Sequence, residues 1–140
     1  MNLTPQQRQR CITLPSGQLC LPTPYTYIFQ FSIPNASQTV LNNVMTLDTD
    51  GDFFLHAIFA IGAAYSMRVQ DANTYYISNA LLPVETFQSL NQPAGAVLDP
   101  EIFFPLGSRI LTDLQDTSGV ANNPVKILFR GIKNLYINLN

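Results

Sequence analysis

From Tyr25 onward the chain alternates between two kinds of side chain, and this two-residue period limits what it can fold into. In the segment 25–32, YTYIFQFS, the side chains of Tyr25, Tyr27, Phe29 and Phe31 share one face of an extended strand. No segment keeps the i, i+3, i+4, i+7 spacing of an amphipathic helix for two full turns. The pattern therefore predicts a globular part that is essentially free of helix.

Further short strands are predicted along the chain, between turns rich in Pro, Gly, Asn and Asp. The segment 52–61, DFFLHAIFAI, is apolar on both faces, which is typical of a strand inside a sheet. This spacing of strands and turns predicts an all-β, jelly-roll-like β-sandwich of about eight strands. An immunoglobulin-like sandwich is the alternative, although the chain has no Trp. The other expected strands are 39–47, 65–71, 74–82, 84–90, 101–107, 109–115 and 126–139.

Residues 1–24 predict an extended N-terminal arm, with the β-sandwich domain spanning residues 25–140. The arm holds four of the ten prolines, and its run QQRQR offers nothing to bury. A short hairpin is possible around Pro15, Ser16 and Gly17. The arm is either a loose terminus or a strap that becomes ordered on a partner. It lacks the apolar stretch of a secretion signal.

Composition points to a single domain that binds other proteins. Charged residues make up 11% of the 140 residues, against about 25% in ordinary soluble domains, while apolar residues make up 46%. A surface so poor in charge suits a chain that lies against protein. The net charge of −2 argues against nucleic acid as a partner. No run of about eighteen apolar residues is present to span a membrane.

The sequence predicts no enzyme, cofactor or metal site. His56, the only histidine, lies in the most apolar segment and has no nucleophile motif near it, so we expect it to be a core residue. Asp48, Asp50 and Asp52 precede that segment, but no register supplies the closing carboxylate of a calcium loop. The carboxylate pairs, including Asp113 with Asp116, are interpreted as solvated turn residues. Cys11 and Cys20 are either reduced thiols or a disulfide pair.

Four segments carry a family resemblance: DTDGDFFLHAI, YSMRVQDANTYYIS, FFPLGSRILTDLQD and ILFRGIKNLY. Together they resemble the jelly-roll cement (decoration) proteins of tailed-phage virions, such as the one on the Bordetella podophage head. The resemblance covers residues 48–136. It implies a non-enzymatic protein, made in the host cytoplasm, that binds the outside of the capsid and clamps neighbouring major capsid subunits. It also implies self-association across symmetry axes.

The expected partners are the phage major capsid protein and a second copy of the chain. We favour a dimer over a trimer, because edge strands can pair across a two-fold axis. Two other functions stay open. One is a neck, tail or fibre-base component of the virion, and the other is a carbohydrate-binding jelly roll that uses Tyr75, Tyr76 and Tyr136. The predicted partner-binding residues are Arg8, Arg10, Tyr25, Tyr27, Lys126 and Arg130.

Overall fold

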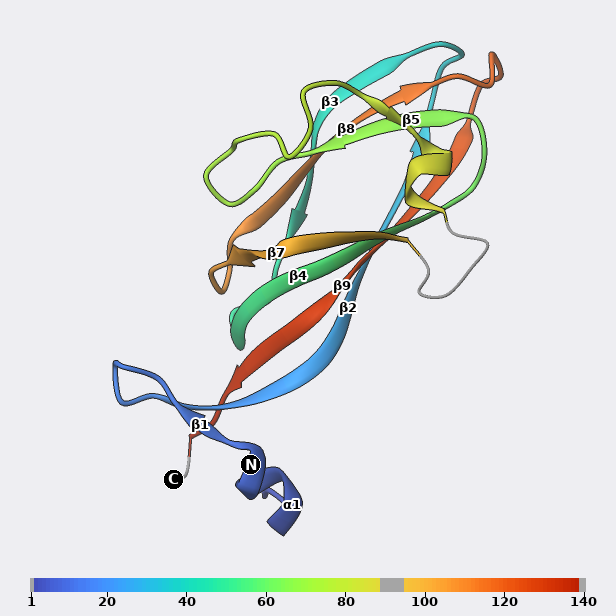
Figure 1. Cartoon of the computed structure of the whole chain (residues 1–140). Helices are drawn as coiled ribbons and strands as arrows, with labels where there is room; N and C mark the ends of the chain where they lie inside the picture. The colour runs from blue at the N-terminus through green and yellow to red at the C-terminus, as the bar shows by residue number, and fades with distance from the viewer. Residues whose placement is uncertain (1, 89–94, 139–140) are drawn as a thin grey trace.

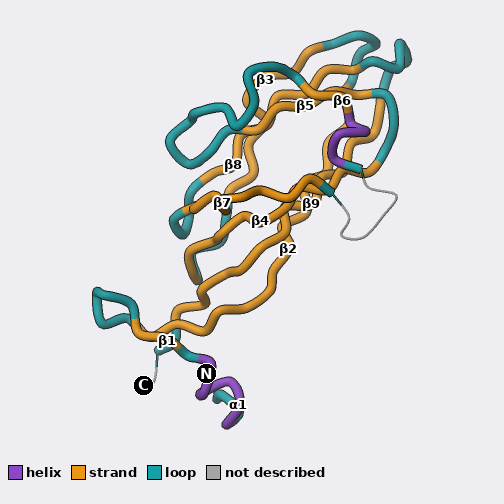
Figure 2. The backbone as a smooth tube through the Cα atoms, in the orientation of Figure 1, coloured by secondary structure: helices purple, strands orange, loops and turns teal. Residues whose placement is uncertain are grey.

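Two antiparallel sheets form the protein, as the computed structural model shows for residues 2–88 and 95–138 (Figure 1). Strands dominate the backbone, and helix is confined to two short pieces (Figure 2). No helix in these described residues is long and apolar enough to cross a membrane. The elements are α1 (Pro5–Arg10), β1 (Ile12–Thr13), β2 (Leu19–Ile33), β3 (Thr39–Thr46), β4 (Gly51–Ile61), β5 (Tyr65–Val69), β6 (Leu82–Pro83), the 3₁₀ helix η1 (Val84–Phe87), β7 (Ala96–Phe104), β8 (Arg109–Asp116) and β9 (Asn123–Tyr136).

The strand order is that of a jelly roll. One sheet has the order β1-β2-β9-β4-β7 and the other has the order β3-β8-β5-β6. From β2 to β5 the chain changes sheet at every step, so most hydrogen-bonded neighbours are far apart in the sequence. An immunoglobulin sandwich instead keeps consecutive strands such as A and B side by side. The predicted all-β, jelly-roll-like sandwich is therefore confirmed.

The core lies between the two sheets and is built from the alternating side chains that the sequence displays. Tyr27 pairs with Phe129, and Phe129 pairs with Ile58, so that all three point inward from adjacent strands. Phe53 and Phe104 add buried rings from β4 and the edge strand β7. Each large apolar side chain buried in this way contributes about 1.5–3 kcal/mol, and their period of two fixes the register.

Beyond the sandwich, β2 and β9 continue as a two-stranded ribbon that carries a small second core. Leu3, Leu21 and Ile137 are buried there, and α1 and β1 lie beside them (Figure 1). We call residues 2–22 and 134–138 the foot. The hairpin expected around residues 15–17 is present, since Ile12 pairs with Cys20. Both cysteines are free, with Cys20 buried.

The N-terminal segment differs from an extended arm in two respects. Residues 5–10 form a helix, because Pro5 occupies its first turn and Thr4 and Gln7 form a reciprocal capping box. Residues 19–24 belong to β2, because Leu19 pairs with Thr13 of β1 and residues 20–24 pair with 132–136 of β9. The β2 strand therefore begins six residues before Tyr25.

Two predicted strands are wrong. Residues 74–81 form a loop. Just before it, Asp71 accepts hydrogen bonds from the amides of Asn73 and Tyr75 and turns the chain. Residues 84–87 form η1 directly after Pro83, while 89 and 90 lie outside the described residues. Conversely, residues 96–100, which lie between the expected strands 84–90 and 101–107, belong to β7.

Candidate interaction surface

The outward side of the β2-β9-β4-β7 sheet carries apolar side chains that nothing in the described chain covers. We call this side the open face. Here the register aligns outward residues in rows across the sheet. No third layer of sheet or long helix lies over it within residues 2–88 and 95–138. The rows are Ile28–Leu128–Phe59, Pro24–Ile132–Phe54–Phe103, Thr26–Arg130–Ala57–Val97 and Gln30–Lys126–Ile61.

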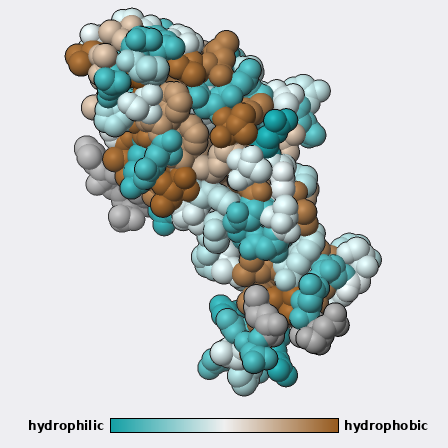
Figure 3. Space-filling view, turned by 180° about the vertical axis from the view of Figure 1, so that it is seen from behind, coloured by the Kyte–Doolittle hydropathy of each residue, from teal (hydrophilic) through white to brown (hydrophobic). Residues whose placement is uncertain are grey.

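Several of these apolar residues are well exposed. Val97 is 63% accessible and Ile28 52%, and Phe103 and Ile61 are also exposed. The Phe54 and Phe103 rings pack side by side, with centroids 5.1 Å apart. Separate apolar areas lie among polar ones on the side seen from behind (Figure 3). Exposed apolar side chains gathered on one sheet face, as these are, mark sites of protein association.

Sequence reasoning missed this surface although its signal was present. The segment 52–61 is apolar on both faces, and this pattern predicts a strand inside a sheet. The structure does place β4 inside its sheet, between β9 and β7, but only its inner face is covered. Phe54 and Phe59 therefore form part of the open face. A strand apolar on both faces in a two-layer sandwich indicates a partner for the second face.

The charges on the open face are unevenly distributed between its strands. Lys126 and Arg130 both point outward from β9, because their even spacing places them on the same face of the strand. The acidic residues Asp99 and Glu101 lie on the exposed bulge of β7, where four residues stand opposite His56 of β4. Lys126 and Arg130 form no ion pair with any carboxylate of the described residues. The β9 side is basic and the β7 side is acidic.

His56 is not the core residue that we expected from its apolar segment. The register of β4 is irregular between Leu55 and Ala57, so the histidine is turned out to the surface. Its Nε2 atom lies 2.7 Å from Glu101 Oε2, and about half of each side chain is exposed. The two side chains therefore form a partly exposed contact on the open face.

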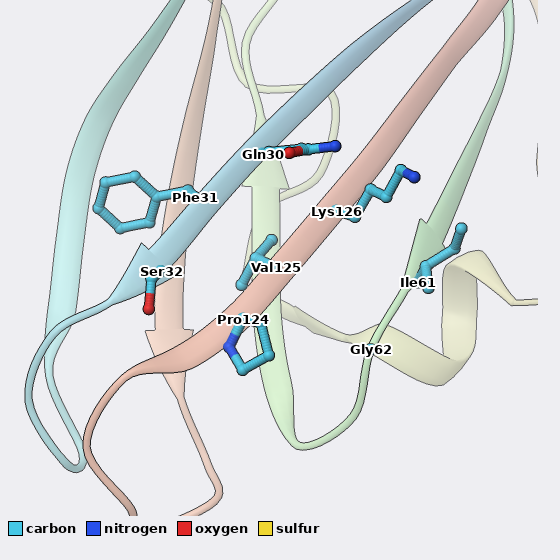
Figure 4. A pocket seen from close by; sticks show the side chains of 8 residues that line it. All are labelled: Gln30, Phe31, Ser32, Ile61, Gly62, Pro124, Val125 and Lys126. Carbon is cyan, nitrogen blue, oxygen red and sulfur yellow. The ribbon is translucent and has the colours of Figure 1, made fainter.

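One end of the open face is hollowed (Figure 4). The hollow has a volume of about 580 Å³ and lies where β2, β9 and β4 run side by side. Gln30, Lys126 and Ile61 point to one side of the sheet, while Phe31 points away from them toward the core. The hollow is shallow, and its polar lining residues Gln30, Ser32 and Lys126 are exposed or half-buried, so it suits protein contact better than a small ligand.

Arg8 and Arg10 lie in the last turn of α1, in the foot, and both are exposed. None of the six residues of α1 is buried. So short a helix is marginal in isolation, and here its N-terminal cap, the buried Leu3 and the half-buried Cys11 hold it. Its outer surface is free to meet a partner. A hollow lined by Leu3, Arg8, Cys11 and Leu19 adjoins it.

Tyr25 and Tyr27 have a structural role instead. Tyr27 lies in the core, and its hydroxyl accepts a hydrogen bond from the Asp48 amide, which corrects its assignment as a contact residue. Tyr25 is partly exposed and donates to Asp48 Oδ2 at 3.3 Å. Both rings lie against the ammonium group of Lys133, at 3.6 and 4.8 Å from their centroids.

Lys133 explains the acidic turn that precedes β4. Its side chain is fully buried, and its Nζ atom donates to Asp48 at 3.0 Å and to Asp50 at 3.1 Å. Asp52 accepts from the Tyr136 hydroxyl and the Leu106 amide. The hydrogen bond from Lys133 lowers the pKa of Asp48. Burial alone would lower the pKa of Lys133, but its hydrogen bonds to Tyr27 and the two carboxylates raise it.

The remaining polar candidates also have structural partners. Asp113 and Asp116, interpreted from the sequence as solvated turn residues, are instead buried in β8. Asp113 pairs with Arg68 at 3.0 Å, and Asp116 accepts from the Ser37 amide in the turn before the neighbouring strand β3. Tyr75 and Tyr76 lie on the loop after β5, with Tyr76 stacked on Arg68, whereas Tyr136 lies in the foot. The structure does not bring the three tyrosines together. No cluster of three or more His, Cys, Asp or Glu with metal-binding geometry occurs in the described residues.

Comparison with known proteins gives no family for this chain. No protein-family model matches it, and no curated protein matches its sequence. Among solved structures, it is similar to a chain in a structure of the Gt strain of infectious bursal disease virus, with a TM-score of 0.24 and 10% identity. The match covers 84% of this chain but only 33% of the viral one. Resemblance at this TM-score carries no information about function.

Proposed function

We propose that this chain is a non-enzymatic structural protein of a tailed-phage virion, which binds the outside of the capsid and clamps neighbouring major capsid subunits. One observation carries the proposal. The chain builds a rigid two-layer sandwich and then leaves an apolar sheet face uncovered. Such a face costs solubility unless a permanent partner covers it. The resemblance of residues 48–136 to phage cement proteins suggests that the permanent partner belongs to a phage capsid.

A clamp needs at least two contact surfaces, and the molecule offers two that differ in character. The open face is broad, with apolar rows on either side of Arg130 and a hollow at one end. The foot is narrow and basic at Arg8 and Arg10, and it projects from one end of the sandwich (Figure 1). We assign the foot to the capsid, because a projecting tip can reach into the groove between two subunits. Many copies on a symmetric shell then act together, so that individually weak contacts suffice.

The test of this assignment is binding to emptied capsids of the phage that encodes the chain. In the full-length protein, Arg8→Glu combined with Arg10→Glu reverses two charges on a helix that buries nothing, so the fold should be kept. We expect binding to fall at least about tenfold, because like charges across an interface oppose association. The matched control is Arg109→Glu, at an exposed position at the start of β8. If the unmodified protein binds no capsid, the clamp is wrong.

The other two functions are separate outcomes of related measurements. A neck, tail or fibre-base protein would be found at a few sites of the virion and would not coat empty shells. A carbohydrate-binding module would bind glycans through exposed tyrosines. Substitution of Tyr75 by Ala would abolish glycan binding and would leave capsid binding unchanged. The separation of Tyr136 from Tyr75 and Tyr76 speaks against a shared sugar platform.

A further inference from the structure

We propose that the open face is covered by the open face of a second copy of this chain, related by a two-fold axis that runs parallel to the strands between β9 and β4. The clamp function assigns the foot to the capsid, and the second copy is the partner of the open face. The pairing itself needs no capsid, so it can be tested on the free protein.

The size of the open face suits a dimer. The four rows span seven residues of β2 and of β9, a length of about 24 Å, and four strands spaced about 4.8 Å apart give a width of about 19 Å. The flat projection of the face is therefore about 450 Å², and protruding side chains and the β7 bulge bring the buried area toward the order of 800 Å² per partner that stable interfaces bury. Two sheets can pack face to face in this way, as they do inside a β-sandwich.

The charge distribution selects the direction of the axis. A two-fold axis across the strands would place β9 over β9 of the partner copy and β7 over β7, so that like charges would meet. An axis parallel to the strands reverses the strand order instead. It places the basic β9 of one copy over β4 of the other, beside the acidic bulge of β7. Opposite charges then meet twice in each dimer.

Arg130 and Glu101 are the residues that this arrangement brings together. Arg130 of β9 pairs with Ala57 of β4. Glu101 contacts His56, the residue directly before Ala57 on β4. An axis along the strands keeps heights roughly unchanged, so Arg130 of one copy faces the His56–Glu101 pair of the other. The apolar row Ile28–Leu128–Phe59 packs against its own symmetry mate nearby.

The same axis places both feet at one end of the dimer. Because the foot continues β2 and β9 along the strand direction, a rotation about that direction leaves it at the same end (Figure 1). An axis across the strands would send the two feet to opposite ends. Two feet pointing the same way can grip two neighbouring subunits of one surface, a consequence that rests on the proposed clamp function.

The test is a charge-reversal pair measured by sedimentation velocity on the full-length protein. We expect the unmodified chain to be a dimer at micromolar concentration. Arg130→Glu alone places acidic residues opposite one another, and Glu101→Arg alone places basic residues opposite one another. Each should raise the dimer dissociation constant at least about tenfold. An equimolar mixture of the two variants should recover dimers, because opposite charges then meet at both symmetric positions.

The mixture also serves as the folding control, since misfolded variants would not rescue one another. Arg109→Glu, on the other sheet, should leave the dimer intact. Three results would overturn the proposal: a monomeric unmodified protein at about 100 µM, a dimer indifferent to both substitutions, or a mixture that stays monomeric. If capsid binding fails while the mixture still recovers dimers, only the clamp function is contradicted.

Discussion

Lys133 and Arg130 lie three residues apart on β9, but one of these cations is buried and the other is exposed. Lys133 points into the sandwich, where its ammonium group is fully buried against two carboxylates and two tyrosine rings. Arg130 points outward from the same strand, is exposed, and pairs with no carboxylate of the described residues. The odd spacing of three residues places them on opposite faces.

The difference separates the part of the molecule that holds the fold from the part that is available to partners. The polar groups around Lys133 connect β9 to other elements of the same chain. Asp48 and Asp50 follow β3, and Tyr25 and Tyr27 belong to β2. The outward residues of the same strands contribute little to the core. We therefore expect substitutions on the inner face to change stability, and those on the open face to change association.

The largest effect should come from removing both carboxylates beside Lys133. We expect Asp48→Asn combined with Asp50→Asn to lower the free energy of unfolding by about 2–4 kcal/mol, because a buried ammonium group loses its counterions. This loss of stability lies toward the low end of what breaking a buried ion pair costs, since both carboxylates are about half exposed. Urea denaturation measures it. Asp99→Asn combined with Glu101→Gln, on the open face, is the matched control, and an equal loss in both would break the comparison.

The second largest effect on stability should come from acid, which protonates the carboxylates of Asp48 and Asp116. The pKa of Asp116 is lowered by hydrogen bonds from the Ser118 hydroxyl and the Ser37 amide, and that of Asp48 by Lys133. A carboxyl group with a lowered pKa stabilises the fold above its unfolded value of about 3.9, and this stabilisation is lost as pH falls through the folded value. The melting temperature should therefore be level near neutral pH and fall below about pH 4.

Asp116→Asn sharpens this second prediction. The variant should be less stable than the unmodified chain at pH 7, and the difference should shrink as the pH falls toward 2. Thermal melts followed by circular dichroism at several pH values measure both curves. Parallel curves for the two proteins would show that Asp116 does not contribute to the acid dependence.

The smallest effect on stability should come from the open face. We expect Ile28→Thr to change the free energy of unfolding by no more than about 0.5 kcal/mol in the monomer, because the side chain is already half exposed. The same substitution should weaken association. Denaturation at a protein concentration below the dimer dissociation constant isolates the monomer term. A loss of more than about 1.5 kcal/mol would mean that the open face belongs to the folding core.

Much of the fold could be predicted because it depends on local alternation. Tyr27, Phe29 and Phe31 point inward as their period of two indicates, and the strands at 39–46 and 109–116 lie close to the expected ranges. The segment 74–82 failed because its apolar residues serve a loop, where Tyr76 stacks on Arg68. Helix α1 was missed because a capping box, not a hydrophobic stripe, defines it.

The functional surface could be predicted only in part. Lys126 and Arg130 share a face because their even spacing requires it. The partners of Lys133 lie more than eighty residues away, and no local pattern shows which carboxylates a jelly-roll connection will place beside it. The rows of the open face likewise depend on the register of four strands that are distant in sequence.

The copy number of the chain in purified virions tests the clamp function most directly. Quantitative mass spectrometry against the major capsid protein gives this number without any assumption about which surface is used. A protein that clamps neighbouring subunits over a whole shell must be present in hundreds of copies per particle, and this is the result we predict. About a dozen copies would assign the chain to the neck or tail, and its absence from the particle would contradict a virion role altogether.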